Sequence, residues 1–144
     1  FCFEGFLSVN KPSRRKHLEE IKDEKRTLVF YEAPHKLLTT LKDFEQTLGD
    51  RKIAVCKELT KIHESVFLFT LNEAYTYFLQ NPPKGEYVLI IEGKKEEKRE
   101  FSLSEAAELA KKLLNEGFSA SAAAKEAARI TGVKKSGIYK EICT

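Results

Sequence analysis

The 144 residues of the chain are enough to bury one hydrophobic core and to form a small additional module. Contents of 42% hydrophobic and 33% charged residues exclude an intrinsically disordered chain, and no apolar stretch approaches the roughly 20 residues of a membrane-spanning helix. The net charge is only +3, but basic residues outnumber acidic ones beyond Ser119, which is compatible with contact to a polyanion.

The cysteines indicate the cellular compartment, and the first residue indicates whether the sequence is a fragment. Three cysteines lie far apart without a CxxC pair, so we expect neither a structural zinc site nor a disulfide framework, and we expect a reducing, cytoplasmic location. The sequence contains no methionine and begins at Phe1 without a signal-peptide pattern. We therefore expect it to be a fragment of a longer protein.

Alternating strands and helices are predicted along the first two thirds of the chain. Strands are expected over residues 1–7, 27–31, 52–57, 65–71 and 87–91, and helices over residues 12–25, 34–48 and 73–79. This order predicts an α/β fold, a mixed five-stranded sheet with flanking helices and at least one antiparallel strand pair. The run 87–91 is apolar on both faces, which is typical of a central strand in a covered sheet.

A charged segment divides the chain into two predicted parts. Residues 94–101 form a linker between an α/β domain, residues 1–93, and a helical tail module, residues 102–144. Helical periodicity in the tail predicts three helices, the first two of which begin at serine caps.

The tail also carries the spacing of a helix-turn-helix. Ala128, Gly132 and Ile138 occupy the small-residue, turn-glycine and aliphatic positions of that motif. Three lysines of the third helix are candidates for phosphate contacts, namely Lys134, Lys135 and Lys140. The alternative is a small helical cap that packs on the sheet domain.

Two polar motifs follow directly on apolar strand-like runs, at residues 31–36 and 57–64. Open α/β sheets build ligand sites just past the carboxyl ends of their strands. The candidate side chains are Glu32, His35, Glu58, Thr60, Lys61, His63 and Glu64. Any one of them can instead be a solvated loop charge or a helix cap. No HxxxH, HExxH or GxSxG spacing is present, so we expect no metal site and no serine nucleophile.

Four ordered segments resemble the ribosomal RNA small subunit methyltransferase I group of the tetrapyrrole methylase superfamily. They are Glu4–Leu7, Phe30–Leu37, Lys57–Lys61 with Glu64, and Gly85–Leu89. The resemblance covers essentially the whole chain and corresponds to the second half of such an enzyme. The sequence departs from the family pattern at Ser8, where proline is usual, and at Lys36 and Lys57, where arginine is usual. The two lysines keep the charge but lose the bidentate geometry of a guanidinium.

The resemblance implies a two-domain, usually dimeric enzyme that uses S-adenosylmethionine to methylate the ribose 2′-hydroxyl of a cytidine in small-subunit ribosomal RNA. It implies that the cofactor lies between the domains and that its glycine-rich loop belongs to the first domain, which this sequence lacks. Residues 1–93 then correspond to the second domain of the tetrapyrrole methylase fold. We expect this fragment to be inactive alone, with the missing N-terminal domain, the RNA and a second copy as its partners, and no membrane contact.

The same resemblance assigns candidate residues to roles. The cofactor-binding candidates are Tyr31, Glu32, Ala33, Gly85 and Glu86, largely through backbone groups. The catalytic candidates are Glu58, Lys61 and Glu64, which orient the ribose, accept its proton, or hold a phosphate or the forming alkoxide. The RNA-binding candidates are His35, Lys36, Thr60, Lys134, Lys135 and Lys140. Gly85 can alternatively be a simple turn residue after Pro82 and Pro83.

Two other functions stay open. One is a methylase of the same superfamily that acts on a tetrapyrrole, against which the Glu58–Lys61 motif and the basic tail argue. The other is a nucleic-acid-binding module of helix-turn-helix type with the α/β part as a scaffold, which leaves both strand-end motifs unexplained.

Overall fold

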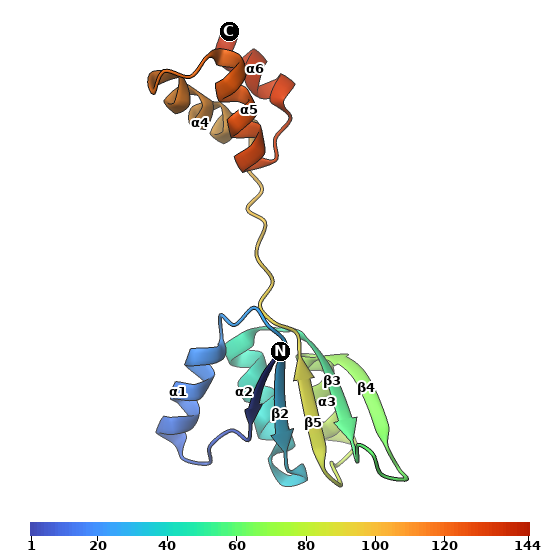
Figure 1. Cartoon of the computed structure of the whole chain (residues 1–144). Helices are drawn as coiled ribbons and strands as arrows, with labels where there is room; N and C mark the ends of the chain where they lie inside the picture. The colour runs from blue at the N-terminus through green and yellow to red at the C-terminus, as the bar shows by residue number, and fades with distance from the viewer. The chain divides into compact units, whose positions relative to one another are not determined.

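The computed structural model describes residues 1–144 as two compact units, Phe1–Glu96 and Glu97–Thr144 (Figure 1). The division falls within the charged run 94–101. The first unit is α/β and the second consists of three helices, so the predicted fold class is confirmed.

A mixed five-stranded sheet forms the centre of the first unit. Its strands are β1 (Cys2–Gly5), β2 (Leu28–Glu32), β3 (Lys52–Lys57), β4 (Ser65–Thr70) and β5 (Tyr87–Ile91), and they lie in the order β1-β2-β5-β3-β4. β1 and β2 are parallel, whereas the β2–β5, β3–β5 and β3–β4 pairs are antiparallel. β2 and β3 therefore end at the same edge of the sheet, where β5 begins.

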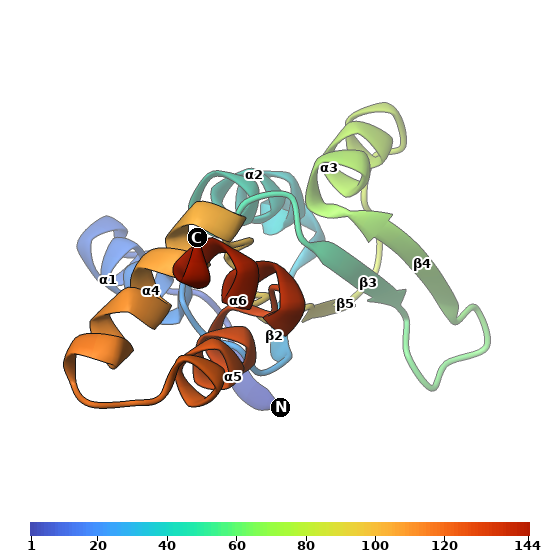
Figure 2. The same cartoon turned by 90° about the horizontal axis from the view of Figure 1, so that it is seen from above.

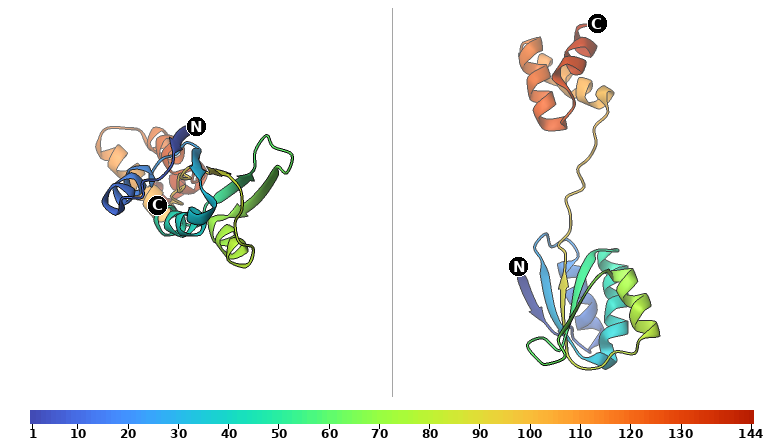
Figure 3. Two further views of the ribbon diagram at one scale, coloured as in Figure 1. Left: turned by 90° about the horizontal axis from the view of Figure 1, so that it is seen from below. Right: turned by 90° about the vertical axis from the view of Figure 1, so that its right-hand side faces the viewer.

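The helices of this unit cover one face of the sheet (Figures 2 and 3). They are α1 (Lys11–Ile21), the 3-10 turn η1 (Pro34–Lys36), α2 (Leu37–Leu48) and α3 (Leu71–Gln80). α2 buries one face with helical spacing and presses Phe44 against Phe30 of β2, with ring centroids 4.8 Å apart. This contact lies in the hydrophobic core between helices and sheet.

The opposite face of the sheet is apolar but has no covering helix in this unit (Figure 3, right). Paired positions carry one apolar row across the strands, Phe3, Val29, Ile90, Ala54 and Leu68. The edge members of this row are exposed, Phe3 by 56% and Leu68 by 79%. The structure thus differs from the prediction that the strand 87–91 is covered on both sides. An apolar run in the sequence predicts that both faces of a strand are shielded from water. It does not identify the segment or molecule that covers each face.

The second unit packs α4 (Leu103–Asn115), α5 (Ala120–Thr131) and α6 (Lys135–Cys143) around an alanine-rich core that includes Ile138. Serine caps were predicted for the first two helices, at Ser102 or Ser104 and at Ser119 or Ser121, and the residues that cap them are Ser102 and Ser119. Gly132 adopts a left-handed conformation with φ 74° between α5 and α6, in the turn of the predicted helix-turn-helix spacing. None of the helices in the structure combines the length and apolar character needed to cross a membrane.

Candidate functional site

A pocket of about 720 Å³ lies at the sheet edge where β2 and β3 end and β5 begins. Across this edge, Tyr87 of β5 pairs with Glu32 on one side and with Lys57 on the other. The register explains why both polar motifs reach one place. The pocket is lined by Phe6, Tyr31, Glu32, Ala33, Pro34, His35, Leu59, Thr60, Glu86, Tyr87 and Val88.

Glu32 is a buried carboxylate at the floor of this site, with only 4% of its surface exposed. One oxygen accepts a hydrogen bond from the backbone N–H of Ala33 at 2.8 Å, and the other accepts from the hydroxyl of Thr40 at 2.6 Å. The Thr40 oxygen in turn accepts from the guanidinium of Arg14 at 2.8 Å. Arg14 also donates to Asp43 at 2.8 Å. This chain of hydrogen bonds satisfies a carboxylate that would be costly to bury alone.

A second cluster joins the β3–β4 loop to the turn before β5. The Glu58 carboxylate accepts a hydrogen bond from the backbone N–H of Glu86 at 2.5 Å, and the Glu58 N–H donates to the Glu86 carbonyl at 2.8 Å. The Lys61 ammonium lies 3.0 Å from the Glu86 carboxylate and 3.4 Å from that of Glu58. Glu64 accepts from the backbone N–H of Thr60 at 2.7 Å. These contacts fix the shape of an otherwise exposed loop.

The electrostatics of this cluster follow from the same contacts. The hydrogen bond from the Glu86 backbone, helped by Lys61, holds the pKa of Glu58 below its ordinary value. The hydrogen bond to the Glu86 carboxylate raises the pKa of Lys61. Glu58 is therefore ionised and a weakened proton acceptor, and Lys61 is charged.

The residues predicted from sequence fall into four places. The pocket lining contains Tyr31, Glu32, Ala33, His35, Thr60 and Glu86. Gly85, Glu58, Lys61 and Glu64 belong to the loop cluster beside it. Lys36 lies at the start of α2, next to His35. Lys134, Lys135 and Lys140 lie exposed in the second unit, where Lys135 donates to Ser121 at 3.0 Å.

Sequence reasoning missed several residues of this site. Leu59 and Val88 line the pocket, and Arg14 and Thr40 hold Glu32 from α1 and α2. Thr40 carried a visible signal, because it is a polar residue on the otherwise apolar buried face of α2. No group of three or more histidine, cysteine or acidic side chains is arranged to hold a metal ion.

The fold matches that of a methyltransferase. The crystal structure of the methyltransferase CobJ is similar to this chain with a TM-score of 0.50 and 18% sequence identity, over 65% of this chain and 41% of that one. At this identity the likeness shows the fold alone, which is the tetrapyrrole methylase fold. No family model matches the sequence.

Sequence comparison is more specific. The chain is 39% identical over 142 residues to the ribosomal RNA small subunit methyltransferase I of Synechocystis sp., covering 97% of this chain and 51% of that protein. The namesake from Halalkalibacterium halodurans is 42% identical over 144 residues, with 96% and 50% coverage. That from Escherichia coli O157:H7 is 39% identical over 143 residues, with 97% and 49% coverage. The chain belongs to the ribosomal RNA small subunit methyltransferase I family, and it spans about half the length of the curated relatives it matches.

Proposed function

We propose that this chain forms one half of an S-adenosylmethionine-dependent enzyme that methylates the ribose 2′-hydroxyl of a cytidine in small-subunit ribosomal RNA. The observation that carries the proposal is the similarity, over 97% of the chain, to proteins named ribosomal RNA small subunit methyltransferase I. The other half of such a protein supplies the glycine-rich cofactor loop that this sequence lacks, so the chain is inactive alone. It works in the cytoplasm as part of a dimer.

The pocket at the sheet edge suits one side of a nucleoside cofactor. Its volume of about 720 Å³ lies within the range of small-molecule sites. Phe6, Leu59 and Val88 offer apolar contacts, and polar residues such as Tyr31, Thr60 and Glu86 line the same pocket. The residues that would hold the cofactor are Tyr31, Glu32, Ala33, Gly85 and Glu86. When bound, S-adenosylmethionine supplies an electrophilic methyl group.

The loop cluster is the proposed substrate side. Methylation joins the ribose oxygen to the methyl carbon, breaks the bond between that carbon and sulfur, and releases the hydroxyl proton. Glu58 and Glu86 position the Lys61 ammonium, which remains 49% exposed and can hold a phosphate or the forming alkoxide. Because the Glu58 carboxylate contacts both the Glu86 N–H and the Lys61 ammonium, we assign Glu58 to positioning. We assign proton acceptance to Glu64, whose carboxylate forms no salt bridge and accepts a hydrogen bond from the Thr60 N–H.

RNA contacts come from two parts of the chain. Thr60 and His35 line the pocket, and Lys36 adjoins it. Three exposed lysines of the second unit add a phosphate-binding surface, namely Lys134, Lys135 and Lys140. Contacts of this kind contribute affinity by charge and position the RNA without reading its sequence.

The test is methyl transfer from labelled S-adenosylmethionine to isolated small ribosomal subunits. We expect label at a cytidine ribose with a chain that also contains the other half of the relatives' length, and none with this chain alone. In the active long chain, Lys61→Ala and Glu64→Gln should each lower kcat by about 100-fold, whereas Lys42→Ala on the exposed side of α2 should not. Absence of label with the long chain would refute the function. Unchanged kcat in both variants would refute only the residue assignment.

A further inference from the structure

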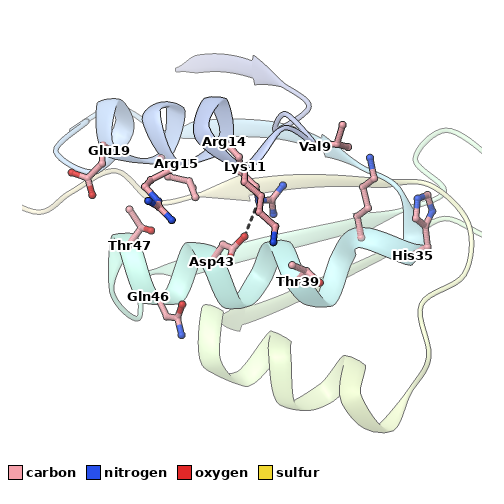
Figure 4. A pocket seen from close by; sticks show the side chains of 12 residues that line it. Val9, Lys11, Arg14, Arg15, Glu19, His35, Thr39, Asp43, Gln46 and Thr47 are labelled. Carbon is pink, nitrogen blue, oxygen red and sulfur yellow. Dashed lines mark hydrogen bonds and ion pairs between the residues drawn. The ribbon is translucent and has the colours of Figure 1, made fainter.

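A second cavity of the α/β unit lies outside the site described above. It is a groove of about 590 Å³ between α1 and α2 (Figure 4). α1 contributes Lys11, Arg14 and Arg15, and the 3-10 turn η1 before α2 contributes His35 and Lys36. Neither cofactor binding nor methyl transfer, as proposed, uses the α1 side chains.

Basic side chains outnumber acidic ones in the groove. Its two acidic residues are already engaged, Asp43 by Arg14 at 2.8 Å and Glu19 by Lys22 at 2.9 Å. Lys11, Arg15 and Lys36 line the same groove and form no salt bridge. Three cations thus face one cavity without a protein partner, and their mutual repulsion is relieved when an anion binds between them.

Arg14 links the two helices that form the walls of the groove. Its side chain is only 15% exposed and is held by Asp43 on one side and by Thr40 on the other. Because Arg14 spans from α1 to two residues of α2, it fixes the spacing of the two helices that form the walls.

The topology directs the positive ends of both helices toward the pocket. β1 and β2 are parallel, and each is followed along the chain by its own helix, so α1 and α2 begin at the same edge of the sheet. Neither helix has an acidic residue in its first turn. Cations at a helix N-terminus are unfavourable, because they add to the positive end of the helix dipole. Lys11 and Lys36 occupy such unfavourable positions at the starts of α1 and α2. His35, next to Lys36, lines both the groove and the pocket.

We propose that this groove binds the sugar-phosphate backbone of the RNA strand whose nucleotide enters the adjacent pocket. The inference rests on the proposed function for the identity of the strand, whereas the groove's affinity for RNA phosphates stands on its own charge. Lys11, Arg15 and Lys36 contact phosphate oxygens, and the hydroxyl of Thr39 on the α2 wall is a further donor. His35 marks the point at which the strand passes from the groove into the pocket.

The experiment measures binding of a fluorescent single-stranded RNA oligonucleotide to the 144-residue chain by anisotropy, as a function of salt. The test variant is Lys11→Ala with Arg15→Ala. The matched control is Lys16→Ala with Lys42→Ala, which removes the same number of charges from exposed positions of α1 and α2 that do not line the groove. Each phosphate contact to a single strand contributes about 0.7 to the slope of log affinity against log salt. The test variant should therefore lower the slope by about 1.4 and the affinity by about 10-fold or more at 0.1 M salt.

The outcomes separate this inference from the proposed function. Equal losses of affinity and slope in the test and control variants would overturn the groove, even if the long chain methylates RNA. The expected difference would support the groove, even if the long chain transfers no methyl group. A parallel arm replaces the RNA with vesicles containing anionic lipid. Binding to vesicles through Lys11 and Arg15, without binding to RNA, would overturn the proposal in favour of a membrane surface.

Discussion

The Glu58 carboxylate occupies the space that a side chain at Gly85 would need. A Cβ built on Gly85 would lie 2.4 Å from Glu58 Oε1, and Gly85 has φ 84°, a conformation that side chains disfavour. The glycine thus lets the β3–β4 loop close onto the turn before β5, where Glu58 receives its hydrogen bond from Glu86. The contact between the end of β3 and the start of β5 thus depends both on the Glu58–Glu86 hydrogen bond and on the absence of a side chain at Gly85.

Gly85→Ala should therefore separate the loop from the turn. Gly5→Ala is the matched control, because Gly5 has φ 69° in the same unit but has no atom within 4 Å of an added Cβ. A positive φ alone costs a non-glycine residue about 1 kcal/mol, so the control reports that term. Gly85→Ala should lose more stability in urea unfolding than Gly5→Ala. Equal losses would show that Glu58 moves aside freely and that the coupling is weak.

Removal of the Thr40 hydroxyl should destabilise the chain through Glu32. Thr40→Val keeps the side-chain volume but takes one of two hydrogen bonds from a buried carboxylate and one acceptor from Arg14. A buried polar group left without its partner costs about 1–3 kcal/mol. Thr39→Val, on the exposed neighbouring residue, should change the free energy of unfolding by less than about 0.5 kcal/mol. If the two variants unfold alike, the hydroxyl does not support Glu32.

The strands were the most predictable part of the fold. The strand 52–57 was predicted to the residue, and the apolar run 87–91, which was recognised within the segment 85–93, forms β5. In both cases apolar residues are bounded by charged or glycine positions. The start of α3 was misplaced, since the helix begins at Leu71 rather than at residue 73. The signal was present as a capping box, in which Thr70 and Glu73 exchange side-chain and backbone hydrogen bonds.

The candidate site was predictable only in part. Residues that directly follow a strand lie at the edge of the sheet where that strand ends. Both polar motifs could therefore be placed at one edge from the sequence. The support of Glu32 could not be predicted, because Arg14 comes from a helix that precedes β2 and meets Thr40 only after packing. Helix periodicity gives the face of α1 that is buried but not the angle at which it lies on α2.

The lowered pKa of Glu58 predicts a pH dependence of stability. Because its folded-state pKa lies below the ordinary value of 4.5, its ionised form stabilises the fold. That contribution is fully present above pH 4.5 and is lost as the pH falls through the lowered pKa. The difference in Tm between the parent chain and Glu58→Gln should accordingly be positive at pH 7 and shrink below pH 4.5. A difference that stays constant down to pH 2 would show that the carboxylate gains nothing from its contacts.

The open face of the sheet predicts self-association of this chain. Leu68 and Val66 on β4 are 79% and 54% exposed, and the paired row of apolar residues continues from Leu68 across the sheet to Phe3. Apolar surface of this extent is typical of an interaction face, and a second copy offers the same surface in return. Sedimentation velocity should show dimers that Leu68→Lys reduces, because a charge at this point would be buried without a partner. Ile62→Lys is the control, since Ile62 is 97% exposed in the β3–β4 loop rather than on the sheet. If both variants sediment like the parent chain, the open face is not the surface through which copies of the chain meet.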